Sequence, residues 1–174
     1  EGYASDITRT FPIGGKFSKP KRDLYSIVLE AQKAAIAQVK KNNSFNDPHI
    51  AAVKVLAQGL KDLKILQGSV NSIIEKEEYK KFYMHRTSHW MGLDVHDVGD
   101  YFDHRGKPVK LKNGQILTIE PGLYFSDDRS VPKVFRNIGI RIEDDVLVNN
   151  SHPEVLTSSC PKEIDELESI IGKG

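Results

Sequence analysis

The sequence predicts an α+β fold with a mixed, mostly antiparallel sheet. The expected elements run in the order strand, helices, several strands and a closing helix, without the regular strand–helix alternation of a parallel sheet. The 174 residues are 39% hydrophobic and 28% charged, which is the balance of a globular protein with a real core. No internal repeat or low-complexity segment argues for a repetitive architecture.

The first half of the chain reads as one strand followed by helices. Along residues 3–13, small or polar side chains alternate with a set that includes the apolar Ile7 and Phe11, and the segment ends in a turn that contains Pro and Gly, which predicts a strand. Residues 18–41 begin with Ser-Lys-Pro and carry apolar residues at the helical period. Residues 46–68 begin with Asn-Asp-Pro and form a second apolar stripe, and residues 70–80 are expected to form a short polar helix.

The second half is expected to supply most of the sheet. Residues 115–125 predict a strand that is broken at Pro121-Gly122, and residues 138–149 predict another strand. Residues 126–136 between them read as a loop. Residues 161–171 predict a closing amphipathic helix.

Composition excludes several classes of partner. Lys and Arg total 25 against 24 Asp and Glu, so no basic excess indicates nucleic acid. No apolar run approaches the roughly 18 residues that span a bilayer, and no signal peptide is recognisable, so we expect no membrane partner. The single Cys160 excludes an internal disulfide and a cysteine-based zinc cluster, and it favours a reducing compartment such as the cytoplasm.

Acidic residues occur in three of the expected strands. Glu120 ends a strongly apolar strand, where burial is costly unless the carboxylate is paired or bound to a metal. Strand alternation puts Arg141 and Glu143 on one face. Asp6 has small neighbours on its own face, which leaves room beside its carboxylate. Taken singly, Glu120 and Glu143 fit an ordinary exposed position better than a functional one, and Asp6 fits a turn or edge position.

Three histidines lie within residues 85–96. The spacing of His85 and His89 resembles a helical zinc pair, but Arg86 stands where that metalloprotease motif requires Glu. Core and loop histidines are the alternative. If the strands are neighbours, three carboxylates and one His form a set that suits Mn²⁺, Co²⁺, Fe²⁺ or Zn²⁺. A carboxylate-rich set can also bridge two ions about 3.5–4 Å apart.

Four blocks of sequence resemble the signatures of one enzyme family. They are YASDITRTFP (residues 3–12), SHWMGLDVHDVG (88–99), IEPGLY (119–124) and GIRIEDD (139–145). In wording and order they are similar to the Xaa-Pro aminopeptidase (aminopeptidase P) family of "pita-bread" metallopeptidases, in its proteobacterial form. The resemblance implies that fold, here incomplete, with helices packed on one side of the sheet.

The resemblance also implies the roles of individual residues. It assigns the metal ligands as Asp6, His89, Glu120 and Glu143. It makes Glu120 a proton shuttle as well, and His85 and His96 the groups that hold the substrate. Arg141 would orient the carboxylates, with Tyr124 as a further supporting group. The implied cofactor is two Mn²⁺ ions, with Co, Zn or Fe as alternatives.

The implied reaction releases the N-terminal residue from peptides with Pro in second position, by attack of a hydroxide bound to the two metals. The family's first ligand Asp precedes the position of Asp6 by more residues than the five present here. We therefore expect residues 1–174 to be the C-terminal portion of a catalytic domain, weak or inactive alone, whose parent forms homo-oligomers. A prolidase that cleaves X-Pro dipeptides and a pita-bread pseudo-enzyme that acts as a binding module are the alternatives.

Overall fold

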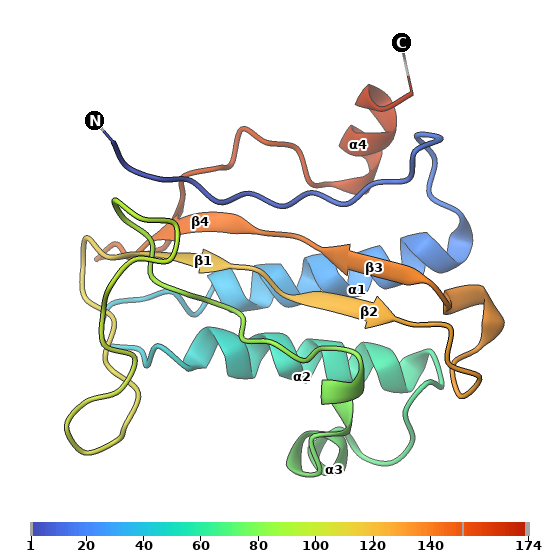
Figure 1. The fold of residues 1–174 in the computed structure, drawn as a ribbon, viewed down its shortest axis with the longest axis horizontal. Helices are drawn as coiled ribbons and strands as arrows, with labels where there is room; N and C mark the ends of the chain where they lie inside the picture. Colours follow the sequence, from blue (N-terminus) through green and yellow to red (C-terminus); the bar gives the residue numbers. More distant parts are fainter. Residues whose placement is uncertain (1, 151, 173–174) are drawn as a thin grey trace.

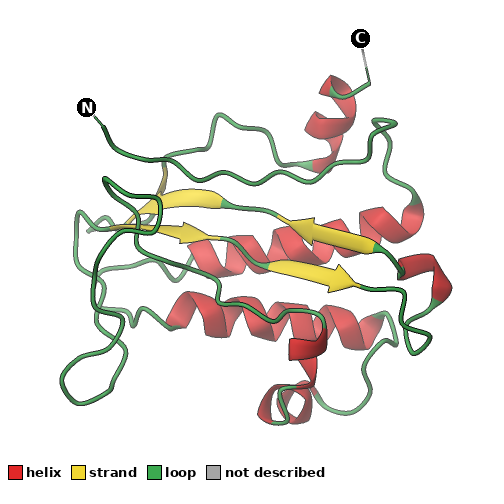
Figure 2. Ribbon diagram, viewed as in Figure 1, coloured by secondary structure: helices red, strands yellow, loops and turns green. Residues whose placement is uncertain are grey.

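The computed structural model describes residues 2–150 and 152–172 and confirms the α+β class (Figures 1 and 2). The helices are α1 (Lys19–Ile36), α2 (Asp47–Asp62), α3 (Val70–Glu75) and α4 (Ile164–Ile170). The strands are β1 (Ile116–Ile119), β2 (Gly122–Phe125), β3 (Ile138–Arg141), β4 (Asp144–Leu147) and β5 (Glu154–Val155). In these two described stretches, no helix has the length and apolar character needed to cross a membrane.

The strand pairs β1–β4 and β2–β3 follow one another as a long ribbon with a gap in its middle, and β5 adds a third strand at one end. β1 pairs with β4, β2 pairs with β3, and β5 adds to β4, all antiparallel. The register is the same on both sides of the gap, so Glu120 lies opposite Glu143. Pro121 has no N–H to donate and separates β1 from β2. The strand breaks therefore coincide with two of the acidic residues singled out in the sequence.

Two extended segments flank this ribbon. The first, residues 4–10, follows the β3–β4 side and is called the N-terminal edge; its one backbone bridge joins Thr8 to Glu143. The second, residues 87–91, follows the β1 side and is called the histidine edge. There the amides of Thr118 and Glu120 donate to the carbonyls of His89 and Thr87, at 3.0 and 2.8 Å. Four extended segments thus run side by side.

Helices α1 and α2 pack against each other and cover one face of the ribbon, as predicted (Figure 1). Apolar side chains that are fully buried, such as Leu24 and Leu56 from the helices and Leu117 and Ile142 from the ribbon, belong to one continuous core. Gly59 allows the helices to approach closely, since a Cβ there would lie 2.5 Å from a methyl group of Ile27. This packed layer gives the ribbon a fixed support.

Several predicted boundaries were wrong. The predicted strand over residues 3–13 makes only the Thr8 bridge, because side chains rather than a backbone ladder hold it. The helix expected to reach residue 41 ends at Ile36. The helix expected over 70–80 splits at Glu77, whose φ of 54° is left-handed, and a 3-10 turn follows at Glu78–Lys81. The expected loop over 126–136 contains a further 3-10 turn, Lys133–Phe135, and the two-residue β5 was not predicted.

Candidate metal centre

The four side chains expected to bind metal lie together, one from each of the four adjacent segments. They are Asp6 from the N-terminal edge, Glu143 between β3 and β4, Glu120 between β1 and β2, and His89 from the histidine edge. Residues directly opposite one another in an antiparallel pair project from the same face. The register thus explains why residues from 6 to 143 in the sequence converge.

The ligand atoms are close enough to share cations. His89 Nε2 lies 3.5 Å from Asp6 Oδ2 and 3.6 Å from Glu120 Oε1. Ligand atoms of His89, Glu120 and Glu143 all fall within 4.8 Å of one another, and so do those of Asp6, His89 and His96. His96, which was expected to hold substrate, is therefore also within ligand range, with its ring centre 4.4 Å from that of His89.

Glu143 provides a direct test of whether a cation fits this site. Its side chain is 2% exposed, and its Oε2 accepts a 2.5 Å hydrogen bond from the Thr8 hydroxyl. Its Oε1 is buried and has no hydrogen-bond partner among the described residues. A buried carboxylate oxygen without a partner is costly, and a divalent cation would satisfy it. The donor set of oxygens and one imidazole suits a hard or borderline cation.

The electrostatics of the carboxylates agree with that fit. Burial, followed by the charge of Glu143, raises the pKa of Glu120 to about 7. Burial also raises the pKa of Glu143, and the charge of Asp6 adds to that shift. The positive charge of Arg141 lowers both pKa values, and its Nη1 lies 3.4 Å from Glu120 Oε2. The site therefore concentrates negative charge that one neighbouring guanidinium does not balance.

His85, Tyr124 and Arg141 form a hydrogen-bonded group beside Glu120. The Tyr124 hydroxyl lies 2.8 Å from His85 Nε2 and receives a 2.8 Å bond from Arg141 Nε. Burial lowers the pKa of His85, with a further contribution from the charge of Arg141. The structure thus brings both predicted supporting residues, Arg141 and Tyr124, into contact with one predicted substrate-holding histidine.

Sequence reasoning missed the residues that fix Asp6 in place. The Asp145 carboxylate accepts the Asp6 backbone N–H at 3.2 Å and the Ser5 hydroxyl at 2.9 Å. Its fully buried neighbour Asp144 accepts hydrogen bonds from Arg9, Gln32, Thr157 and Lys162. Three consecutive acids in an alternating strand must occupy both faces, and that pattern could have revealed them.

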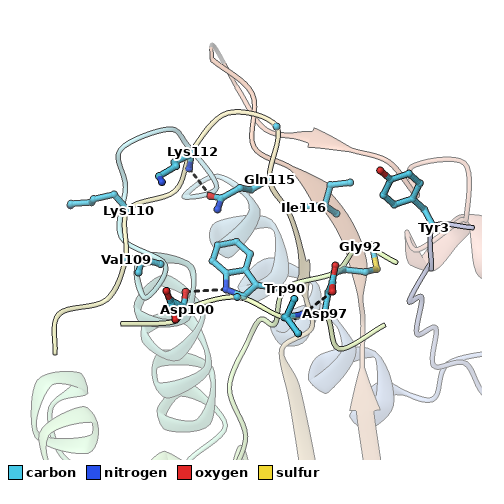
Figure 3. Close-up of a pocket in the computed structure, with 14 residues that line it drawn as sticks. Tyr3, Trp90, Gly92, Asp97, Asp100, Val109, Lys110, Lys112, Gln115 and Ile116 are labelled. Atoms are coloured by element: carbon cyan, nitrogen blue, oxygen red, sulfur yellow. Dashed lines mark hydrogen bonds between the residues drawn. The ribbon is translucent and has the colours of Figure 1, made fainter. Parts of the chain in front are cut away.

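A separate cavity of about 390 Å³ lies beside the histidine edge (Figure 3). Trp90 and Asp97 line it, and none of the four predicted ligands does. The Trp90 indole N–H donates to the Asp100 carbonyl at 3.1 Å. A Cβ at Gly99 would lie 2.6 Å from that indole ring, so only glycine fits there. This cavity is therefore not the metal centre.

Comparison with known proteins places the chain among metallopeptidases. Residues 1–150 match metallopeptidase family M24. The Xaa-Pro aminopeptidase of Haemophilus influenzae is 45% identical over 169 residues, which cover 97% of this chain and 39% of that protein. Among solved structures, Pseudomonas aeruginosa aminopeptidase PepP matches with a TM-score of 0.95 and 46% identity, over 97% of this chain and 38% of that one.

A zinc-substituted Escherichia coli aminopeptidase P in complex with product matches with a TM-score of 0.92 and 42% identity. The match covers 98% of this chain and 38% of that one. The chain thus spans about two fifths of the relatives that it matches. These similarities confirm the predicted resemblance to aminopeptidase P and its pita-bread fold. The chain belongs to metallopeptidase family M24.

Proposed function

We propose that this chain is the C-terminal portion of the catalytic domain of a metal-dependent Xaa-Pro aminopeptidase. The enzyme would release the N-terminal residue from peptides whose second residue is Pro. The observation that carries the proposal is that Asp6, His89, Glu120 and Glu143 fall into two overlapping groups of ligand atoms that share His89, and that Glu143 Oε1 is buried with no hydrogen-bond partner among the described residues. Similarity to Xaa-Pro aminopeptidases over nearly the whole chain supports the substrate class.

Asp6, His89, Glu120 and Glu143 would hold two divalent cations, for which we propose Mn²⁺, with Co²⁺, Zn²⁺ or Fe²⁺ as alternatives. Bound cations of this kind activate water and polarise the scissile carbonyl. Glu120 would accept and return a proton at its carboxylate. Arg141 would hold that carboxylate in place through its contact at 3.4 Å.

His85 and His96 would hold the peptide on the two sides of the site. His96 lies against the His89 ring, and His85 is fixed by the Tyr124 hydroxyl. A neutral His85 has its one N–H on Nδ1, where it donates to the Arg86 carbonyl at 2.7 Å, so its Nε2 accepts the Tyr124 hydroxyl proton and His85 would contact the peptide as part of this fixed group. We further propose a cytoplasmic location, on the strength of the single Cys160, and a homo-oligomeric parent protein.

Metal binding and peptide cleavage test the proposal together. MnCl₂ is titrated into the 174-residue chain by calorimetry, and the longer native polypeptide containing it is assayed on an X-Pro-Y tripeptide and on an X-Pro dipeptide. We expect weak Mn²⁺ binding and little turnover by the 174-residue chain, with tripeptide cleavage by the longer polypeptide. Glu143→Gln removes a proposed direct ligand and should weaken Mn²⁺ binding by more than the roughly 10- to 100-fold that loss of an outer-shell group costs, whereas the exposed Glu154→Gln should not change it.

The alternatives give different results. Cleavage of the dipeptide alone would identify a prolidase. If neither protein binds Mn²⁺ and neither cleaves the tripeptide or the dipeptide, the result would favour a binding module. Two tightly bound Mn²⁺ ions and normal turnover in the 174-residue chain would contradict its expected low activity.

A further inference from the structure

A buried polar network lies directly behind the histidine edge, and nothing in the proposed reaction uses it. The Thr87 hydroxyl lies 2.8 Å from His49 Nδ1 and 2.7 Å from the Tyr83 hydroxyl. Thr87 and Tyr83 are fully buried. His49 comes from the first turn of α2, so the network joins the helical layer to the segment that carries His85 and His89.

The protons of this network can be assigned from its partners. Burial lowers the pKa of His49 to about 4, so its imidazole is neutral at pH 7. Among the described residues, Thr87 is the one hydrogen-bond partner of the Tyr83 hydroxyl, which therefore donates to Thr87. The Thr87 hydroxyl has one proton and donates it to His49 Nδ1. This direction fixes the tautomer of His49 with its proton on Nε2.

Thr87 is placed where it can influence both sides of the metal centre. It lies two residues from His85 and two from His89, and its carbonyl accepts the Glu120 N–H at 2.8 Å. The Tyr83 ring contacts the His85 ring edge to face, with their centres 4.8 Å apart. One hydroxyl therefore anchors the backbone between two histidines and beside one carboxylate.

We propose that His49, Tyr83 and Thr87 are positioning residues for the metal site. They fix the backbone of the histidine edge so that His85, His89 and Glu120 keep their mutual geometry. The effect on metal binding rests on the proposed function, whereas the ordering of the histidine rings does not. Groups that orient metal ligands from outside the ligand shell commonly change affinity by about 10- to 100-fold when removed.

The test compares Thr87→Val, which removes the hydroxyl at constant shape, with Thr87→Ser, which keeps it. Side-chain NMR on the whole 174-residue chain measures the His49 ring ¹⁵N shifts and the line widths of the His85 and His89 rings. Calorimetry with CoCl₂ measures metal affinity. Tyr25→Phe is the matched control for Tyr83→Phe, because Tyr25 is also fully buried and its hydroxyl donates to the Lys162 carbonyl, away from this network.

We expect an unprotonated Nδ1 on His49 in the wild-type chain. Thr87→Val should broaden the His85 and His89 ring signals and weaken Co²⁺ binding about tenfold, and Thr87→Ser should restore both within about twofold. Tyr83→Phe should act in the same direction, and Tyr25→Phe should not. Unchanged ring signals in Thr87→Val would overturn the proposal. A wild-type chain that binds no Co²⁺ but shows the ring broadening in Thr87→Val would contradict the proposed function and leave the positioning role supported.

Discussion

The two edges that flank the central ribbon hold their site residues by different physical means. The N-terminal edge makes one backbone bridge to the ribbon and is otherwise held by its side chains. Among them, Arg9 forms an ion pair with Asp144, which also pairs with Lys162. The histidine edge makes a series of backbone hydrogen bonds to β1 and adds the neutral network of His49, Tyr83 and Thr87. The segment that carries Asp6 thus depends on hydrogen bonds to the Asp145 carboxylate and on the Arg9–Asp144 ion pair, whereas the segment that carries His89 depends on a backbone ladder.

This difference predicts where the molecule is sensitive to substitution. In a segment held by a backbone ladder, loss of one side chain should lower the free energy of unfolding only slightly, because the remaining hydrogen bonds keep the segment in register even where nearby rings lose order. A buried ionic cluster does not, since removal of one charge leaves its partners unpaired in a low dielectric. The largest effects should therefore arise at the N-terminal edge.

Asp144→Asn should have the largest effect on stability. Asp144 is fully buried, and the Arg9 side chain that contacts it is 8% exposed. Burial would raise the pKa of Asp144, but hydrogen bonds from Lys162, Thr157 and Arg9 hold it below its ordinary value. Loss of the charge leaves two cations without their anion, so the free energy of unfolding should fall by about 3–5 kcal/mol in urea denaturation.

Asp128→Asn is the matched control for this substitution. Asp128 makes a 2.8 Å ion pair with Lys81 in an accessible loop. Water and salt screen exposed pairs, so we expect no measurable change in unfolding. Equal losses in the two variants would show that burial of the Asp144 cluster does not distinguish it from a surface pair.

The same contrast explains how much the sequence could predict. Strand alternation and the break at Pro121 singled out Glu120 and Glu143 as candidates, because these patterns act over a few residues, but only the resemblance of four blocks assigned all four predicted ligands, Asp6 and His89 included. The helical layer followed from the apolar period of residues 18–41 and 46–68. These features depend on residues that are close in sequence, so they can be recognised without knowledge of the tertiary structure.

The partners of the anchoring groups could not be predicted in this way. Asp144 meets Arg9 and Lys162 only after the chain has folded, and His49 reaches Thr87 across 38 positions of sequence. The strand predicted over residues 3–13 was wrong for the same reason. Its apolar and polar residues alternate as in a strand, but hydrogen bonds from its side chains, and not a backbone ladder, hold it against the ribbon. Tertiary context decided these cases.

Thr8→Val should have an intermediate effect, because it removes the one hydroxyl that bonds to Glu143. Both oxygens of that buried carboxylate would then lack a partner, since Oε1 already has none among the residues described. We expect a loss of about 1–2 kcal/mol in the free energy of unfolding of the metal-free chain. Thr10→Val removes two hydrogen bonds, one donated to the Arg141 carbonyl and one accepted from the Arg141 N–H, but it leaves no charged group without a partner, so we expect a loss no larger than that of Thr8→Val.

The most local effect, and the sharpest test of the comparison, is local opening measured by amide hydrogen exchange. The Glu143 N–H donates to Thr8 across the N-terminal edge at 3.1 Å, and the Glu120 N–H donates to Thr87 across the histidine edge at 2.8 Å. Under native conditions, Thr8→Val should accelerate exchange at Glu143 about tenfold, which corresponds to about 1.4 kcal/mol of opening free energy, and leave Glu120 unchanged. Thr87→Val should reverse the pattern. Equal acceleration of both amides in either variant would mean that the edges open as one cooperative unit, and the distinction between an edge held by charges and an edge held by a ladder would then have no energetic meaning.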